Sequence, residues 1–163
     1  MKALLASAAV AAAVLVSAPA AAADFAGPRV GVHVGIAGDD LGSRIGGETF
    51  GIEAGYDMPI SDASRFGVAV EYQNDFGDDF GRELSATARF GTRFASDNAL
   101  FYVAGGYTNL SGGGEDLDGA RIGAGLEYAV GDSGLSLKVE QRYADYEQDL
   151  EAFQTVAGVA FRF

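Results

Sequence analysis

The chain has 163 residues, with 11 Lys or Arg against 23 Asp or Glu, and its formal net charge is −12. This acid excess disfavours nucleic acid as a partner, because phosphate binding needs clustered Lys and Arg. There is no cysteine and only one histidine, His33, so we predict no disulfide, no metal site and no cofactor. Glycine is abundant, at 24 residues against 3 prolines, which suggests that ordered structure uses glycine.

Residues 1–23 have the pattern of a cleaved signal peptide. Lys2 precedes an apolar stretch from Ala3 to Val16, and small residues follow, with Ala21 and Ala23 at the positions that a signal peptidase prefers. The apolar stretch is shorter than the roughly 20 residues of a membrane-spanning helix. We therefore predict cleavage after Ala23 and a single exported domain over residues 24–163.

The rest of the chain contains eight segments in which apolar residues alternate with small or polar ones. In chain order the apolar positions span 30–36, 50–56, 66–72, 84–90, 101–107, 122–128, 135–143 and 153–163. A period of two indicates strands, and no helical period persists. Spanning strands need about 9–11 residues each, so the length fits eight strands and excludes the sixteen of a wide porin. We predict an all-β, eight-stranded, antiparallel up-and-down transmembrane barrel.

The alternate positions of these segments carry glycines and charges of both signs. An eight-stranded barrel has an interior just wide enough for side chains to fill, and glycines with long ionic side chains suit that space, whereas the apolar face suits lipid. Buried charges persist only in pairs. We therefore predict an ion-pair network in the lumen, made of Glu53, Glu71, Arg89, Arg121, Glu127, Lys138, Glu140, Arg142 and Arg162.

Aromatic residues on the apolar face fall at both ends of the segments. If the strands run alternately up and down, one belt holds Phe50, Tyr72, Tyr107, Tyr143 and Phe153, and the other holds Tyr56, Phe66, Phe90, Phe101, Tyr128 and Phe161. Paired aromatic belts are typical of the two membrane interfaces of a β-barrel.

The connections alternate in length. The long ones are predicted at 37–48, 74–82, 109–119 and 144–150, and the shorter turns at 59–64, 95–98 and 131–134. The long loops are acidic; their residues include Asp39, Asp40, Asp75, Asp78, Asp79, Glu115, Asp116 and Asp118. Membrane barrels of bacteria have short periplasmic turns and longer outer loops. We therefore expect the acid excess to lie on the outward end.

The last six residues carry the most specific motif. Gly158, Phe161 and Phe163 match a closing Gly-x-x-aromatic-x-aromatic pattern, although Val156 stands where a polar residue is usual. With this motif the chain resembles the eight-stranded outer-membrane barrels of the OmpA transmembrane domain, OmpX and NspA type over all of residues 24–163. The resemblance implies a monomer in the outer membrane whose last strand is read by the barrel-assembly machinery.

Three functions follow from this resemblance. The first is a structural or surface-interaction role in the membrane. The second is a narrow channel for ions or small solutes, in which rearranged lumen ion pairs act as a gate. The third is lipid A modification, which some similar barrels perform with a His, a Ser and an acidic residue near the outer rim. His33 has no such neighbours in the sequence and falls on the lumen parity, so we predict no catalytic residue.

The acidic loops have two interpretations. Carboxylates can bind divalent cations that bridge to lipopolysaccharide phosphates, because hard cations favour oxygen ligands. Alternatively, the loops form a solvated acidic rim, since none has the Asp-x-Asp-x-Asp-Gly spacing of a dedicated calcium site.

Overall fold

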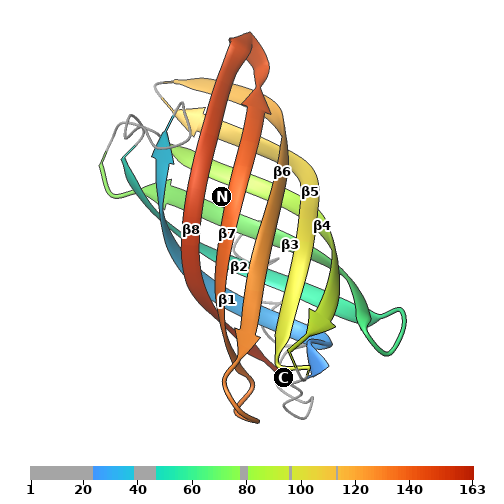
Figure 1. Cartoon of the computed structure of the whole chain (residues 1–163). Coiled ribbons are helices and arrows are strands. Elements are labelled where there is room, and N and C mark those ends of the chain that lie inside the picture. The colour runs from blue at the N-terminus through green and yellow to red at the C-terminus, as the bar shows by residue number, and fades with distance from the viewer. Residues whose placement is uncertain (1–23, 39–46, 78–80, 96, 113) are drawn as a thin grey trace, which may run out of the picture.

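A computed structural model describes residues 24–38, 47–77, 81–95, 97–112 and 114–163. Eight strands form a closed barrel in which each strand pairs antiparallel with the next, and the last pairs with the first (Figure 1). The strands are β1 (Gly27–Gly38), β2 (Glu48–Pro59), β3 (Ser64–Asp75), β4 (Arg82–Phe94), β5 (Ala99–Gly112), β6 (Glu115–Ala129), β7 (Leu135–Tyr146) and β8 (Leu150–Arg162). The predicted eight-stranded, up-and-down, all-β fold is confirmed. Residues 1–23 lie outside the described part, and their cleavage stays a prediction.

Closure of the barrel leaves no free strand edge. His33 of β1 stands opposite Gly158 of β8, and beyond the ladder the Phe163 amide donates to the Pro28 carbonyl at 3.2 Å. A membrane interior offers no water to satisfy an unpaired backbone group, so a closed sheet is a way to span it. Within the described residues, no helix is long and apolar enough to cross a membrane.

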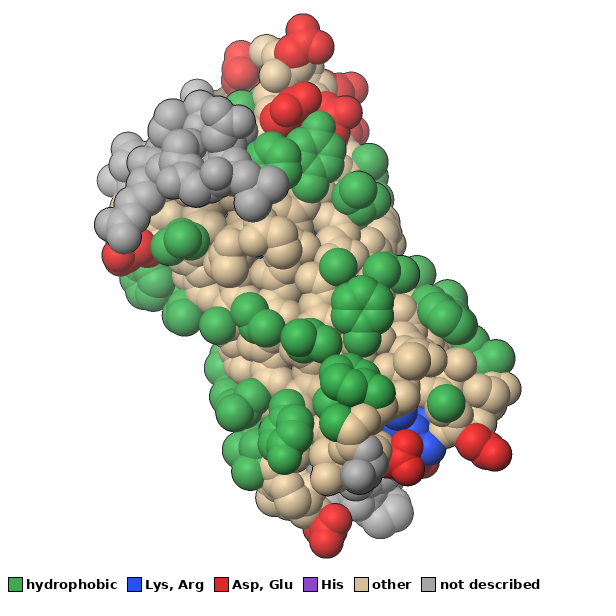
Figure 2. Space-filling view, in the orientation of Figure 1, with side chains coloured by type: hydrophobic (Ala, Val, Ile, Leu, Met, Phe, Trp, Pro, Cys, Tyr) green, Lys and Arg blue, Asp and Glu red, His purple; other side chains and the backbone are tan. Residues whose placement is uncertain are grey.

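Side chains alternate between the two faces of the wall as the sequence predicts. On β1, Val32, Val34 and Ile36 are 49–56% exposed on the outer face, while His33 between them is 3% exposed in the lumen. The outer face is therefore apolar along the body of the barrel, and hydrophobic side chains cover it in Figure 2. This is the surface that a hydrocarbon environment requires.

Aromatic side chains lie near both ends of this apolar face. We call the end with the β1–β2, β3–β4, β5–β6 and β7–β8 connections the loop end, and the opposite one the turn end. At the loop end Phe50 contacts Phe76 at 4.8 Å between ring centres, and Tyr143 contacts Phe153 at 4.9 Å. At the turn end Phe161 packs edge-on against Phe163 at 5.1 Å. This placement is that of the predicted belts.

Two of the predicted long loops are instead paired strand. β5 continues to Gly112 and β6 begins at Glu115, where the prediction places a loop over 109–119. Likewise β7 runs to Tyr146, a short 3-10 turn η3 (Glu147–Asp149) follows, and β8 begins at Leu150. Backbone pairing continues past the apolar pattern because ladder hydrogen bonds do not need an apolar face. The β7–β8 hairpin consequently projects from the loop end (Figure 1).

Candidate functional site: the charged lumen

The lumen holds seven basic and seven acidic side chains among the described residues, and each is at most 8% exposed. The basic ones are Arg29, Arg65, Arg89, Arg121, Lys138, Arg142 and Arg162; the acidic ones are Glu53, Asp57, Glu71, Asp75, Glu83, Glu127 and Glu140. All nine residues of the predicted network are in this set. Equal numbers of the two signs make the interior close to neutral, which is the condition for keeping charges buried.

Five members of this set were not predicted to belong to the network. Arg29, Asp57, Arg65 and Glu83 lie on the inward parity just beyond the apolar segments that defined the strands. Extending each strand by one inward position would have found them. Asp75 was predicted to lie on an outer loop, but it is the last residue of β3 and is 6% exposed. The longer strand turns its side chain inward.

Near the turn end four charges form a closed ring. Arg89 binds Asp57 through two hydrogen bonds of 2.8 and 2.6 Å, and it donates to Glu127 at 3.0 Å. Arg162 bonds to the same Glu127 and Asp57, the latter at 3.2 Å. Ser136 adds a hydroxyl donor to Glu127 at 2.5 Å. The four ring residues come from β2, β4, β6 and β8, so the ring ties strands across the lumen.

A second cluster occupies the middle of the lumen around Glu71. Arg142 binds both Glu71 oxygens at 2.7 and 2.8 Å and also Glu140 at 2.8 Å. Arg121 reaches Glu71 at 2.9 Å. Glu140 accepts a further bond from the Tyr102 hydroxyl at 2.6 Å. Bidentate guanidinium–carboxylate bonds of this length are the strong, directional kind.

Towards the loop end the acceptor is Glu83, and most of its donors are neutral. Gln73 and Gln154 donate amide hydrogens to it at 3.0 and 3.2 Å, and Thr108 donates a hydroxyl at 2.6 Å. Arg121 lies at 3.4 Å and connects Glu83 to the Glu71 cluster. The Arg89 guanidinium lies 4.8 Å from the centre of the Tyr102 ring, and this contact connects the turn-end ring to the Glu71 cluster.

His33 belongs to this network. Its Nε2 is 3.2 Å from the Gln73 side-chain oxygen and 3.8 Å from Glu71, and its side chain has no solvent exposure. No other histidine exists in the chain. A rim His–Ser–acid constellation of the kind used on lipid A therefore cannot be built from this residue.

Glycines give the long side chains room to lie against the wall. A methyl group on Gly55 would stand 2.2 Å from the Arg29 guanidinium, and one on Gly67 would stand 1.9 Å from the Asp57 carboxylate. Both positions would also approach a backbone carbonyl of a neighbouring strand, at 2.7 and 3.2 Å. The high glycine content is therefore partly a consequence of filling a narrow barrel with long ionic side chains.

Small apolar clusters lie beyond the ion pairs at both ends. Phe25, Leu100, Tyr102 and Ala129 form one at the turn end, and Leu110, Ala144, Tyr146 and Ala152 form one at the loop end. Figure 2 shows acidic side chains gathered at the loop end beyond the second cluster. The charged interior is thus capped by hydrophobic contacts.

Several buried polar atoms of the described residues have no hydrogen-bond partner. Most of them lie on the wall formed by β1 and β2: Arg29 Nε and one terminal nitrogen, His33 Nδ1, Thr49 Oγ1 and Glu53 Oε1. An unsatisfied buried group is costly, so sites of this kind are where internal water is expected. Arg29, His33 and Thr49 are thus the less fully bonded residues of this wall, whereas Asp57 and Glu53 of β2 bind Arg89 and Lys138, each at 2.6 Å.

The predicted acidic loop residues lie in three kinds of place. Asp39, Asp40, Asp78 and Asp79 fall outside the described residues, and Asp75 is in the lumen. Glu115, Asp116 and Asp118 are exposed at the start of β6, at the loop end of the barrel. Asp118 accepts from Asn109 at 2.8 Å and from the Tyr107 hydroxyl, while Ser111 donates to Asp116. Among described residues, no group of three or more candidate ligands could hold a metal ion.

The residues of the predicted assembly motif lie on and just past the last strand. Gly158 stands opposite His33, and a methyl group there would stand 2.4 Å from the Val32 carbonyl. Phe161 is 40% exposed on the lipid face, beside Phe163 at the turn end.

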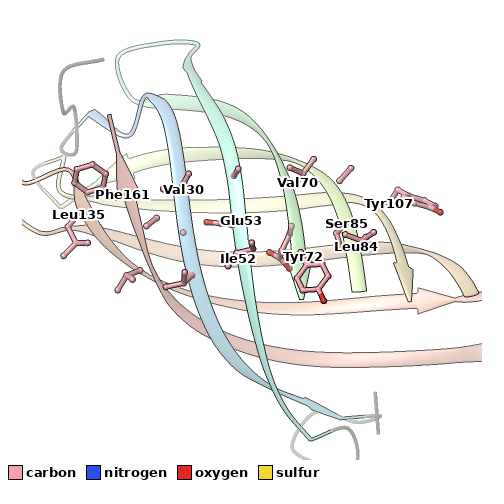
Figure 3. A pocket seen from close by; sticks show the side chains of 17 residues that line it. Val30, Ile52, Glu53, Val70, Tyr72, Leu84, Ser85, Tyr107, Leu135 and Phe161 are labelled. Carbon is pink, nitrogen blue, oxygen red and sulfur yellow. The ribbon is translucent and has the colours of Figure 1, made fainter. Parts of the chain in front are cut away.

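One concavity, of about 810 Å³, is lined by residues of the barrel wall. Its side chains come from seven strands and run from Leu135 and Phe161 at one end to Tyr107 at the other (Figure 3). Outward-facing apolar residues such as Val30, Ile52 and Val70 dominate it. The apolar part of this lining suits contact with lipid chains.

Comparison with known proteins identifies related barrels. The model of the outer membrane protein beta-barrel domain family matches residues 8–163. No curated protein matches the sequence. Among solved structures, the outer membrane enzyme PagL is 19% identical, with 83% of this chain and 99% of that chain covered and a TM-score of 0.59.

Two further structures are similar to the same degree. The N-terminal β-barrel domain of Pseudomonas aeruginosa OprF is 20% identical, covers 85% of this chain and 99% of its own, and has a TM-score of 0.58. Neisserial surface protein A is 19% identical, covers 83% and 96%, and has a TM-score of 0.55. At these identities the likeness shows the fold alone.

Proposed function

Because this chain belongs to the outer membrane protein beta-barrel domain family and lies in the outer membrane, we propose that it is a closed, non-conducting barrel. In this role it has a structural function in the membrane and presents an acidic surface at the loop end. The barrel acts as a monomer and catalyses no reaction.

The network of buried ion pairs and hydrogen bonds in the lumen is the observation that carries this proposal. Arg89, Arg162 and Arg142 each bind two carboxylates, and the side chains of these three residues are at most 6% exposed. Breaking such a buried pair leaves an uncompensated charge, at a cost of about 3–5 kcal/mol. An ion passing through the lumen would have to break several such pairs, so the network opposes ion passage. This supports a role in which the charged side chains fill the barrel rigidly.

Single-channel recording in a planar bilayer tests the closed barrel directly. The protein purified from outer membranes should give no conductance steps, because the lumen has apolar clusters at both ends and ion pairs between them. Regular steps from the unaltered protein at modest voltage would refute the closed state. Folding of the same sample is checked by its heat-modifiable mobility on a gel.

A narrow channel is the second candidate, and the partnerless atoms of the β1–β2 wall favour it. Arg29, His33, Thr49 and Glu53 need water in order to be satisfied, and a file of water could carry ions if the neighbouring pairs loosened. Recording Glu71→Ala and Arg121→Ala beside the unaltered protein separates the two candidates. The channel requires conductance in at least one of the three proteins; silence in all of them rejects it.

The acidic surface is the part of the proposal that concerns partners. Asp116 and Asp118 on β6 and Glu147 and Asp149 in η3 are all exposed at the projecting hairpins. We propose that they attract divalent counter-ions which bridge to lipopolysaccharide phosphates, without a dedicated cage. Calcium titrated into the purified barrel should give weak heat that disappears at high salt, and heat equal to the buffer blank would reject the bridging.

The last strand is the proposed contact with the barrel-assembly machinery. Phe161, which is exposed, and Phe163, which is half-buried, form an aromatic pair next to the β1–β8 junction. Deleting Phe163 should reduce the fraction of chain that reaches the heat-modifiable folded form in cells. Unchanged assembly of that deletion would count against the signal.

A further inference from the structure

Asp24 and Phe25, which Ala26 separates from the first strand, pack against the turn end of the barrel. Phe25 has no solvent exposure and packs against Leu100 and Tyr102 of β5 and Ala129 of β6. The guanidinium of Arg162, a member of the turn-end ring, lies 5.2 Å from the centre of the Phe25 ring. The phenyl ring therefore covers the end of the ion-pair network on the side that opens to the periplasm.

Asp24 is held by a clamp built at the same end. Arg65 donates from Nε to the Asp24 carbonyl at 2.7 Å and from a terminal nitrogen to its carboxylate at 2.5 Å. Arg93 lies 3.5 Å from the same carboxylate. Arg65 is itself fixed, because it also donates to the Ser61 and Ser64 carbonyls at 2.8 and 2.9 Å.

The backbone of this segment is bent in order to reach the lumen. Phe25 has a φ of 47° and Gly27 one of 95°, both in the left-handed region. That conformation is unfavourable for a bulky residue such as phenylalanine. The segment adopts it here because the clamp and the apolar socket both hold it.

We propose that residues 24–25 form a stopper, an intramolecular ligand that seals the turn end of the lumen. The socket, made of Leu100, Tyr102, Ala129 and Arg162, takes the aromatic ring, and the clamp, made of Arg65 and Arg93, takes the acidic residue. The stopper lies beside Arg162 Nε, which has no partner among the described residues. It separates this part of the lumen from bulk solvent, independently of whether the role proposed above is correct.

Cysteine accessibility tests the stopper, since the chain has no cysteine of its own. Ser136→Cys places a thiol of similar size beside Glu127, at a position with no solvent exposure. The full chain is produced with its own leader, purified from outer membranes and treated with a small anionic methanethiosulfonate. With the stopper intact, labelling should be slow; with Phe25→Ala added, its rate should rise by at least about tenfold.

Two controls make the result specific. Phe94→Ala removes an exposed phenyl ring near the same end and should leave the labelling rate unchanged, while Phe25→Leu should restore most of the seal. A thiol at the other end, Thr108→Cys, should not respond to Phe25→Ala. Equal rates with and without Phe25, or an equal rise at both ends, would overturn the proposal.

A milder variant covers the case in which Phe25→Ala fails to assemble. Asp24→Asn keeps the carbonyl that Arg65 binds but removes the charge that faces both arginines. It should raise the Ser136→Cys labelling rate by a factor of about two to five, because an exposed ion pair contributes about 0.2–1 kcal/mol. No rise in folded Asp24→Asn protein, together with slow labelling of Phe25→Leu and Phe25→Ala alike, would show that another element seals the lumen.

Discussion

The two sides of the lumen are bonded very differently. On the side of β3 to β7, Glu71, Glu127 and Arg142 each make several hydrogen bonds of 3.0 Å or less. On the β1–β2 wall, Arg29 lies 3.6 Å from Asp57 and 4.0 Å from Glu53, and neither contact is a hydrogen bond. The arginines of the first side thus support the barrel strongly. Arg29 on the second side has unused bonding capacity, although its neighbours Asp57 and Glu53 bind Arg89 and Lys138, each at 2.6 Å. Two groups of buried charged residues of the same types can therefore contribute unequally to the stability of the barrel.

The largest expected effect is on the tightly bonded side. Arg89→Met removes three hydrogen bonds and leaves Asp57 and Glu127 with one arginine fewer, so it should cost about 3–5 kcal/mol in the free energy of unfolding. Urea titration of the protein in lipid vesicles, followed by gel mobility, measures this loss. If Arg89→Met lowered the free energy of unfolding less than Arg29→Met does, the difference between the two sides would be refuted.

Glycine replacement probes the space that the long side chains occupy. Gly67→Ala would place a methyl group against the Asp57 carboxylate, and overpacking of this kind costs about 1–3 kcal/mol. Gly105→Ala is the matched control, because its nearest neighbours are 3.6 and 3.8 Å away. Its unfolding free energy should stay within about 0.5 kcal/mol of the unaltered protein. Equal losses for the two variants would mean that lumen crowding is not the cause.

A smaller effect is expected on the loosely bonded wall. Arg29→Met removes a guanidinium whose Nε and one terminal nitrogen have no partner among the described residues, so the loss should be about 1 kcal/mol, mostly from the two long ion pairs. The same urea titration applies. A loss as large as that of Arg89→Met would show that water completes the bonding of Arg29 as firmly as protein groups do elsewhere.

The smallest effect belongs to the outer face of the projecting hairpins. Tyr107→Phe deletes the hydroxyl that Asp118 accepts from, at an exposed position, so the expected loss is about 0.5 kcal/mol or less. Thermal unfolding in detergent should show nearly the same midpoint for this variant and the unaltered barrel. A large shift would mean that the hairpins stabilise the barrel as well as present acidic groups.

The barrel and its two faces could be predicted from the sequence because a period of two is a local pattern. The same pattern assigned His33 and the nine network residues to one parity. It did not identify the hydrogen-bond partners. Arg142 and Glu71 are 71 positions apart in the sequence, and their bond follows from the tilt and register of the strands that carry them. Arg29 and Asp57 were missed because each lies one position beyond the apolar stretches 30–36 and 50–56 that defined the two strands. Phe25 could not be assigned, since only the positive φ of its backbone turns it into the lumen.

The pairing of β1 with β8 also has a consequence for how the chain folds. Arg29 stands opposite Arg162, so the last contact to form joins residues from opposite ends of the domain, and its loop-closure entropy is the largest in the fold. Every other strand pair is a hairpin of neighbours and can form early. Until the final pair forms, β1 and β8 are both open edges that can bind other strands. The rate of closure therefore limits how long the chain is exposed to mispairing.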